Sequence, residues 1–279
     1  MGRAKCDVRL LVCDLDGTLA GPGGCGLETA KETLNLCRQK GIRVTVATGR
    51  AFAAAETLLV YLGIDEPIIT NGGALIARIG QPPVYERTID RELAMGIALE
   101  LKALGYPFFF VVEKHMYTHV KGAHAAEYSK ALGYDIKVVG SIREIKGEPT
   151  QIVLRVPTHE CDSILESLYT RWLPKVKVIK SLPHLIEIQP AGVSKAKAVE
   201  FLAGSMNIDR EQVLAIGDGL NDLDMLMWAG MRAAVANAHE VVKRSVSYVS
   251  KLPYAEGVRE IVEKFTGGRI QALGTQPTI

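Results

Sequence analysis

The sequence lacks the cysteine pattern of a disulfide scaffold or a structural zinc site. Its cysteines are odd in number and include no Cys-x-x-Cys pair; they are Cys6, Cys13, Cys25, Cys37 and Cys161. Disulfide-rich proteins and zinc sites need paired cysteines at short, regular spacings. Because free thiols are typical of a reducing compartment, we expect the chain to be cytoplasmic.

Long apolar runs and a charge excess of one sign are missing as well. Apolar runs such as 108–112 are far shorter than the roughly 18 residues of a membrane span, and no secretory leader is evident. The formal net charge is +2, and no basic cluster with interleaved aromatic residues is present. We therefore expect neither nucleic acid nor a membrane as a partner.

What remains is an ordinary globular composition with a regular pattern. Apolar residues make up 48% of the 279 residues, which is enough for a sizeable core and favours about two domains. The apolar run 8–13, broken only by Arg9, predicts a buried strand of a parallel sheet. Helices and strands alternate after it, at 28–40 (helix), 43–47 (strand), 51–62 (helix) and 67–70 (strand). This alternation predicts a doubly wound α/β sheet.

The pattern changes between about residues 82 and 188 and then returns. The middle segment predicts helices at 90–104, 125–132 and 160–169 and strands at 107–112, 150–156, 176–179 and 185–188. The last segment predicts helices at 194–203, after Asp222 and at 258–265, and strands at 212–216 and 231–235. We therefore expect a core domain made of residues 1–81 and 189–279, with an α/β cap domain inserted at 82–188.

Acidic and small polar residues follow three predicted core strands at the point where each strand ends. They are Asp14-Leu15-Asp16-Gly17-Thr18, Thr48-Gly49 and Asp218-Gly219-Leu220-Asn221-Asp222. Ligands bind beyond the carboxyl ends of strands in open α/β sheets, so these segments should converge. Carboxylates this close repel one another unless a cation lies between them. Oxygen ligands without His or Cys favour a hard ion, and we expect Mg²⁺.

Such an arrangement suits the transfer of a phosphoryl group, which requires positioned charge and an in-line nucleophile. The carboxylate of Asp14 can accept the phosphoryl group. Asp16 can protonate the leaving group and then deprotonate the attacking water. The Thr48 hydroxyl and the N–H of Gly49 can bind phosphate oxygens, and Lys195 can supply a positive charge.

Four segments, in order, resemble the motifs of the haloacid dehalogenase superfamily. They are 14–19 (Asp-Leu-Asp-Gly-Thr-Leu), 46–50 (Val-Ala-Thr-Gly-Arg), 193–195 (Val-Ser-Lys) and 217–222 (Gly-Asp-Gly-Leu-Asn-Asp). The first and fourth are highly specific, and the resemblance spans the chain to about residue 265. The insert lies between the second and third motifs. That placement, together with Thr70-Asn71-Gly72-Gly73-Ala74, resembles the Cof-type subfamily with a type IIB cap.

The resemblance implies a Mg²⁺-dependent phosphatase with a core like the Rossmann fold and a cap that selects the substrate. Asp14 would be the nucleophile and Asp16 the general acid and base. Mg²⁺ would be held by Asp14, the backbone carbonyl of Asp16 and Asp218, with Asp222 bound to it directly or acting behind these ligands. The phosphate would be bound by the Leu15 backbone, Thr48, Gly49, Lys195 and Asn221. Ala196 stands where relatives often have glycine after the lysine.

Simpler interpretations exist for each feature taken alone. Asp-x-Asp-Gly after a strand is also a common turn sequence, and a lone lysine such as Lys195 is more often solvated than functional. Four cap residues are weak candidates for contacting the substrate: His115, Tyr117, His119 and His184. The first three alternate along one segment, and such alternation more often marks an exposed strand face.

Three functions fit the sequence. The first is hydrolysis of a small phosphate monoester, such as a sugar phosphate, a phosphoglycolate-like acid or a cofactor phosphate. The second is a phosphomutase that uses the same aspartate, and the third is a phosphometabolite-binding protein without turnover. Release of inorganic phosphate separates the first from the other two. The sequence carries no signal for the oligomeric state.

Overall fold

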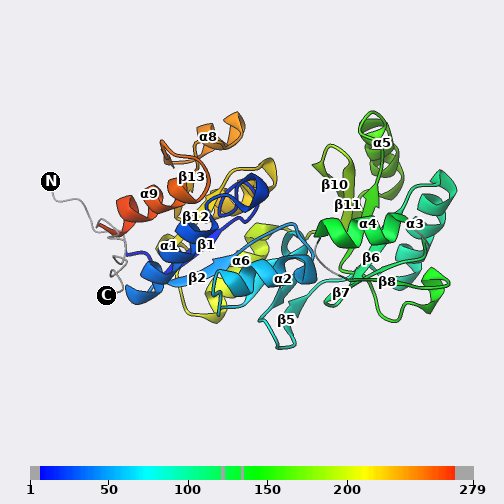
Figure 1. The fold of residues 1–279 in the computed structure, drawn as a ribbon, viewed down its shortest axis with the longest axis horizontal. Coiled ribbons are helices and arrows are strands. Elements are labelled where there is room, and N and C mark those ends of the chain that lie inside the picture. The colour runs from blue at the N-terminus through cyan, green and yellow to red at the C-terminus, as the bar shows by residue number, and fades with distance from the viewer. Residues whose placement is uncertain (1–6, 121–122, 133–134, 268–279) are drawn as a thin grey trace, which may run out of the picture. The chain divides into compact units, whose positions relative to one another are not determined.

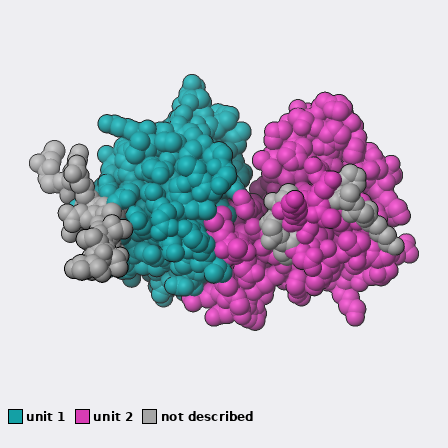
Figure 2. All heavy atoms as spheres, viewed as in Figure 1, with its two compact units in different colours: residues 1–47, 60–66, 199–279 teal, residues 48–59, 67–198 magenta. Residues whose placement is uncertain are grey.

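The computed structural model describes residues 7–120, 123–132 and 135–267. The chain divides into two compact units, 1–47 with 60–66 and 199–279, and 48–59 with 67–198 (Figure 2). The predicted cap, 82–188, lies wholly within the second unit, which also contains parts of the predicted core. Cys6 and the residues after Gly267 lie outside the described residues.

A parallel sheet of five strands, in the order β14-β13-β12-β1-β2, forms the centre of the first unit (Figure 1). The strands are β1 (Leu10–Cys13), β2 (Arg43–Val46), β12 (Val213–Gly217), β13 (Met231–Ala234) and β14 (Tyr248–Val249). Leu10 of β1 pairs with Val213 on one side and with Arg43 on the other. All four residues of β1 are buried, which explains the continuous apolar run.

Helices pack against this sheet through apolar stripes. They are α1 (Leu27–Gln39), α7 (Leu223–Trp228), α8 (Glu240–Ser245) and α9 (Tyr254–Thr266), while α2 (Phe52–Tyr61) and α6 (Lys195–Ser205) each have residues in both units. α9 begins at Tyr254, earlier than the predicted start at residue 258. Gly257 obscured this start in the sequence; a Cβ there would lie 2.2 Å from the Leu252 carbonyl oxygen.

A six-stranded sheet, in the order β10-β11-β9-β6-β7-β8, forms the largest part of the second unit. Its strands are β6 (Phe108–Val112), β7 (His115–Thr118), β8 (Ile136–Val138), β9 (Gln151–Arg155), β10 (Val176–Leu182) and β11 (Leu185–Pro190). All of its pairs are antiparallel except β7 with β8. α3 (Arg91–Leu104) and α5 (Cys161–Trp172) share a core with one face of the sheet, around Phe108, Ile152 and Ile186. On the other face, Tyr128 of α4 (Ala123–Leu132) stacks on Phe109.

The prediction that residues 67–70 continue the parallel core sheet is wrong. β3 (Ile68–Thr70) pairs antiparallel with β4 (Leu75–Ala77), which pairs with β5 (Pro83–Glu86) in a separate three-stranded sheet. The cause is the tight turn at Asn71-Gly72-Gly73, where φ is +52°, +63° and +104°. Two glycines permit this left-handed turn, so the chain reverses directly into a hairpin.

Candidate active site

The first site segment leaves β1 at Asp14 and turns back at once. The N–H of Asp14 donates to the carbonyl of Ile216, 2.9 Å away, which extends the pairing of β1 with β12. The Ala20 N–H donates to the Leu15 carbonyl at 2.8 Å, so the segment closes into a loop. Asp14 is only 4% exposed and Leu15 is fully buried, whereas Asp16 is exposed. The buried Leu15 anchors the loop between the two aspartates.

The second site segment follows β12 and is held by Asp222. Asp222 is fully buried, and its Oδ2 accepts the N–H of Asp218 at 3.1 Å and that of Gly219 at 2.9 Å. These bonds satisfy two donors at the start of the short turn Leu220–Asp222, which leads into α7. A Cβ at Gly217 would lie 2.7 Å from the Asp222 side chain. The loop therefore depends on both glycine and aspartate.

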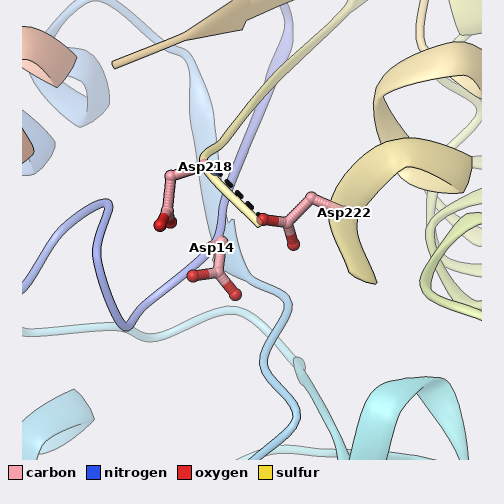
Figure 3. A group of neighbouring side chains, drawn as sticks. All are labelled: Asp14, Asp218 and Asp222. Atoms are coloured by element: carbon pink, nitrogen blue, oxygen red, sulfur yellow. Dashed lines mark hydrogen bonds between the residues drawn. The ribbon is translucent and has the colours of Figure 1, made fainter. Parts of the chain in front are cut away.

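Asp14, Asp218 and Asp222 come together as a carboxylate cluster. One oxygen from each lies within 4.8 Å of the other two, and Figure 3 shows the three side chains grouped beyond the strand ends. The Thr18 hydroxyl donates to Asp218 Oδ1 at 2.7 Å and orients that carboxylate. Gly17 has φ +89°, and a Cβ on it would lie 2.3 Å from Asp218 Oδ2. Only glycine therefore permits this approach.

The residues of the cluster fit a hard divalent cation. Three carboxylate oxygens at this spacing, with neither His nor Cys among them, form the ligand type that Mg²⁺ prefers. The Asp16 side chain is not one of the three. The expected contribution of its backbone carbonyl remains a prediction.

Thr48, Gly49 and Lys195, the expected phosphate ligands of the second and third motifs, belong to the second unit. Thr48 is 1% exposed, and its Oγ1 accepts the N–H of Arg50 at 3.1 Å. Lys195 is 2% exposed at the first position of α6. Ser194 caps that helix by accepting the N–H of Lys197 at 3.2 Å.

Asn221 and Leu15, two further expected phosphate ligands, lie in the first unit. Asn221 is exposed, and a Cβ at Gly219 would lie 2.3 Å from its Oδ1, so the Asn221 side chain folds over that glycine. The structure thus brings together the three carboxylates. Phosphate binding by Leu15, Asn221 and the residues of the second unit remains a prediction.

Asn237 contributes to the site and was missed in the sequence. Its Nδ2 donates to the Gly17 carbonyl at 2.8 Å, and its Oδ1 accepts the N–H of Tyr254 at 3.0 Å. The nearby N–H of His239 donates to the Asp218 carbonyl at 2.9 Å. Asn237 follows β13 in the same sheet, so its place after a strand end was the available signal.

The four cap candidates have different surroundings. His115 is exposed on β7, with its ring 6.3 Å from that of Tyr117. The His119 ring lies 4.8 Å from Phe108, and burial together with the charge of Lys102 lowers the pKa of His119. His184 is half-buried in the turn between β10 and β11. Their role in substrate selection remains a prediction.

Within the described ranges, no helix combines the length and the hydropathy that a membrane crossing requires.

Comparisons with known proteins agree with this fold. Residues 11–262 match the family model of the haloacid dehalogenase-like hydrolases. The stress response protein YhaX of Bacillus subtilis is 27% identical over 267 residues, covering 92% of this chain and 93% of YhaX. The 5-amino-6-(5-phospho-D-ribitylamino)uracil phosphatase YwtE of the same species is 26% identical over 286 residues, covering 94% and 99%.

Solved structures give the same result. A haloacid dehalogenase-like hydrolase from Bacteroides thetaiotaomicron has a TM-score of 0.84 and 26% identity, covering 92% of this chain and 99% of that one. A Thermotoga maritima protein has a TM-score of 0.82 and 28% identity, covering 92% and 97%. The resemblance based on the four motifs is confirmed. The chain belongs to the haloacid dehalogenase-like hydrolase family.

Proposed function

We propose that this hydrolase is a Mg²⁺-dependent phosphatase that acts on small phosphate monoesters through an aspartyl-phosphate at Asp14. The observation that carries the proposal is the cluster of Asp14, Asp218 and Asp222, with one oxygen of each within 4.8 Å of the others. YwtE is named as a phosphatase of a ribityl phosphate, which supports a small phosphate ester as the substrate here.

In the first step, a carboxylate oxygen of Asp14 attacks the phosphorus atom, and the bond between phosphorus and the ester oxygen breaks. Asp16, which is exposed two residues further on, gives its proton to the departing oxygen. The product alcohol leaves, and Asp14 carries the phosphoryl group as a mixed anhydride.

In the second step, the Asp16 carboxylate takes a proton from a water molecule. The water oxygen attacks phosphorus, the anhydride bond breaks, and inorganic phosphate leaves with Asp14 restored. Asp14, Asp218 and the Asp16 backbone carbonyl would hold Mg²⁺, while Asp222 fixes the loop that carries Asp218. When bound, the cation would neutralise negative charge on the phosphoryl oxygens. Thr48, Gly49, Lys195, Asn221 and the Leu15 backbone would bind those oxygens.

The test is phosphate release by the purified chain with Mg²⁺, using para-nitrophenyl phosphate and a panel of sugar and cofactor phosphates. We expect turnover that EDTA abolishes and added Mg²⁺ restores. Rapid-quench mass spectrometry should find the phosphoryl group on the peptide that contains Asp14. Isomerised sugar phosphates without phosphate release would show a mutase, and activity indifferent to EDTA would refute the cation site.

A further inference from the structure

A buried carboxylate outside the cluster of Asp14, Asp218 and Asp222 takes no part in the proposed reaction. Glu187 on β11 is 8% exposed, and Gln151 and Gln189 beside it are 1% and 0% exposed. We call these three residues the amide–carboxylate cluster. They all belong to the second unit, as do Thr48 and Gly49.

Strand alternation places this cluster on one face of the six-stranded sheet. Ile186 and Ile188 of β11 belong to the core that the sheet shares with α3 and α5. Glu187, between them, therefore points to the opposite face, as does Gln189. Elsewhere that face is apolar, around Phe109 and Tyr128. A carboxylate on it is costly to bury unless donors surround it.

Two side-chain amides supply such donors. Gln151 Nε2 lies 2.6 Å from Glu187 Oε2, and Gln189 Nε2 lies 3.2 Å from the same oxygen. The buried Gln189 Oε1 has no hydrogen-bond partner among the described residues. A buried amide oxygen without a partner is unfavourable, so the hydrogen bond to the Glu187 carboxylate determines which way the Gln189 amide points.

Gln151 connects the carboxylate to the segment of the second motif. Its Nε2 also donates to the Gly49 carbonyl at 3.4 Å, and a Cβ at Gly49 would lie 3.9 Å from Glu187 Oε2. The peptide that contains this carbonyl also contains the N–H of Arg50, which donates to Thr48 Oγ1 at 3.1 Å. A continuous path thus runs from Glu187 through Gln151 and one peptide plane to the Thr48 hydroxyl.

We propose that Glu187 is a positioning residue for phosphate binding, in that its ionised carboxylate fixes the Gln151 amide and thereby the Gly49 peptide and the Thr48 hydroxyl. This inference rests on the proposed function, in which Thr48 and Gly49 bind the phosphate. An ionised carboxylate can only accept hydrogen bonds, so it holds Gln151 with Nε2 inward. A protonated carboxyl can donate to the amide oxygen instead and releases this constraint.

Burial of Glu187 brings the change between its ionised and protonated forms close to neutral pH. Burial raises the pKa of Glu187 to about 7, against the opposing effects of the Ser181 and Gln151 hydrogen bonds and of the Lys195 and Lys177 charges. The Glu187 charge in turn contributes to the raised pKa of Tyr128, on the α4 side. The positioned state should therefore prevail above pH 7 and decline below it.

The experiment compares wild type with Glu187→Gln, a neutral side chain of the same shape, from pH 5.5 to 8.5. The matched control is Glu166→Gln, a carboxylate exposed on α5. The measured quantities are KM and kcat for para-nitrophenyl phosphate and, without turnover, the Kd of inorganic phosphate for the Mg²⁺-loaded protein by calorimetry. We expect Glu187→Gln to raise KM and Kd about tenfold at pH 8.5, the effect of losing one hydrogen bond to a charged group. The ratios of KM and Kd between Glu187→Gln and wild type should fall toward one at pH 5.5. The value of kcat should change far less than KM.

Two further variants make the test independent of folding. Glu187→Asp keeps the negative charge and should restore part of the pH dependence of phosphate binding. Gln151→Leu should raise the Kd of phosphate by a factor that does not depend on pH. A Glu187→Gln protein with wild-type Kd at pH 8.5, or with kcat lowered equally at every pH, would overturn the inference. If the ratio of the phosphate Kd of Glu187→Gln to that of wild type changes with pH as expected but wild type hydrolyses no ester, the proposed function fails and the positioning role stands.

Discussion

Replacing Gly17 with alanine should weaken both the fold and the binding of the cation. The residue has φ +89°, and the new Cβ would lie 2.3 Å from Asp218 Oδ2, well inside the closest approach of real Cβ atoms. A left-handed conformation costs a non-glycine residue roughly 1–2 kcal/mol. Asp218 must also move and lose its 2.7 Å bond from Thr18, which costs about 1.5–3 kcal/mol. The total is roughly 2.5–5 kcal/mol.

Gly23→Ala is the matched control. Gly23 lies in the same segment with φ +67°, but a Cβ there would meet no atom within 4 Å. It should therefore incur the backbone cost alone. Urea unfolding of both variants, with and without Mg²⁺, separates the two effects. At a Mg²⁺ concentration of 100 Kd, wild type and Gly23→Ala should gain about 2.7 kcal/mol, whereas a hundredfold weaker site gains about 0.4 kcal/mol.

The refuting result is specific. If Gly17→Ala shows the wild-type gain with Mg²⁺ and loses no more stability than Gly23→Ala, then the close approach of residue 17 to Asp218 does not shape a cation site. Loss of stability without loss of the Mg²⁺ gain would have the same meaning for the cation site.

Three other predictions concern acidic side chains. Asp14→Asn should abolish turnover in a folded protein, and retained phosphate release in a steady-state assay would remove the nucleophile assignment. Asp16→Ala should lower kcat by about 10²–10⁴; a loss under about tenfold would exclude it as the general acid. Glu187 has a pKa raised from 4.5 to about 7, so the folded state holds a proton that the unfolded state releases. Wild type should therefore lose up to about 3 kcal/mol as pH rises from 4.5 through 7, and Glu187→Gln should lack this slope in urea titrations. Equal slopes would contradict the burial argument.

The carboxylate cluster was predictable because it follows from local patterns and one rule of topology. Apolar runs identify β1 and β12, and Asp14 and Asp218 come directly after them. In a parallel sheet the carboxyl ends of neighbouring strands lie at one edge. Pairing of Cys13 with Ile216 confirms that these two strands end side by side.

Other features depend on contacts that no local pattern indicates. Asn237 donates to the Gly17 carbonyl although the two residues are far apart in the sequence. β3 pairs with β4 in a hairpin, which the glycine turn after β3 favours, and is not a strand of the parallel sheet. Glu187 is the single acidic residue in an otherwise largely apolar strand. Such a pattern is typical of a strand in which the acidic residue faces solvent. Its burial becomes evident only when Gln151 is placed beside it by the antiparallel neighbour β9.

A buried carboxylate affects the groups that donate hydrogen bonds to it: side-chain amides for Glu187, and backbone N–H groups for Asp222. Asp222 accepts hydrogen bonds from two backbone N–H groups of its own loop, so we expect its main role to be stabilising the conformation of that loop. Asparagine at 222 can still accept both bonds through Oδ1, whereas alanine cannot. We therefore expect Asp222→Asn to keep most of the Mg²⁺ gain in urea unfolding. Asp222→Ala should lose that gain together with about 1–3 kcal/mol of stability. If asparagine abolishes the gain as fully as alanine, the charge itself binds the cation, and Asp222 is a direct ligand.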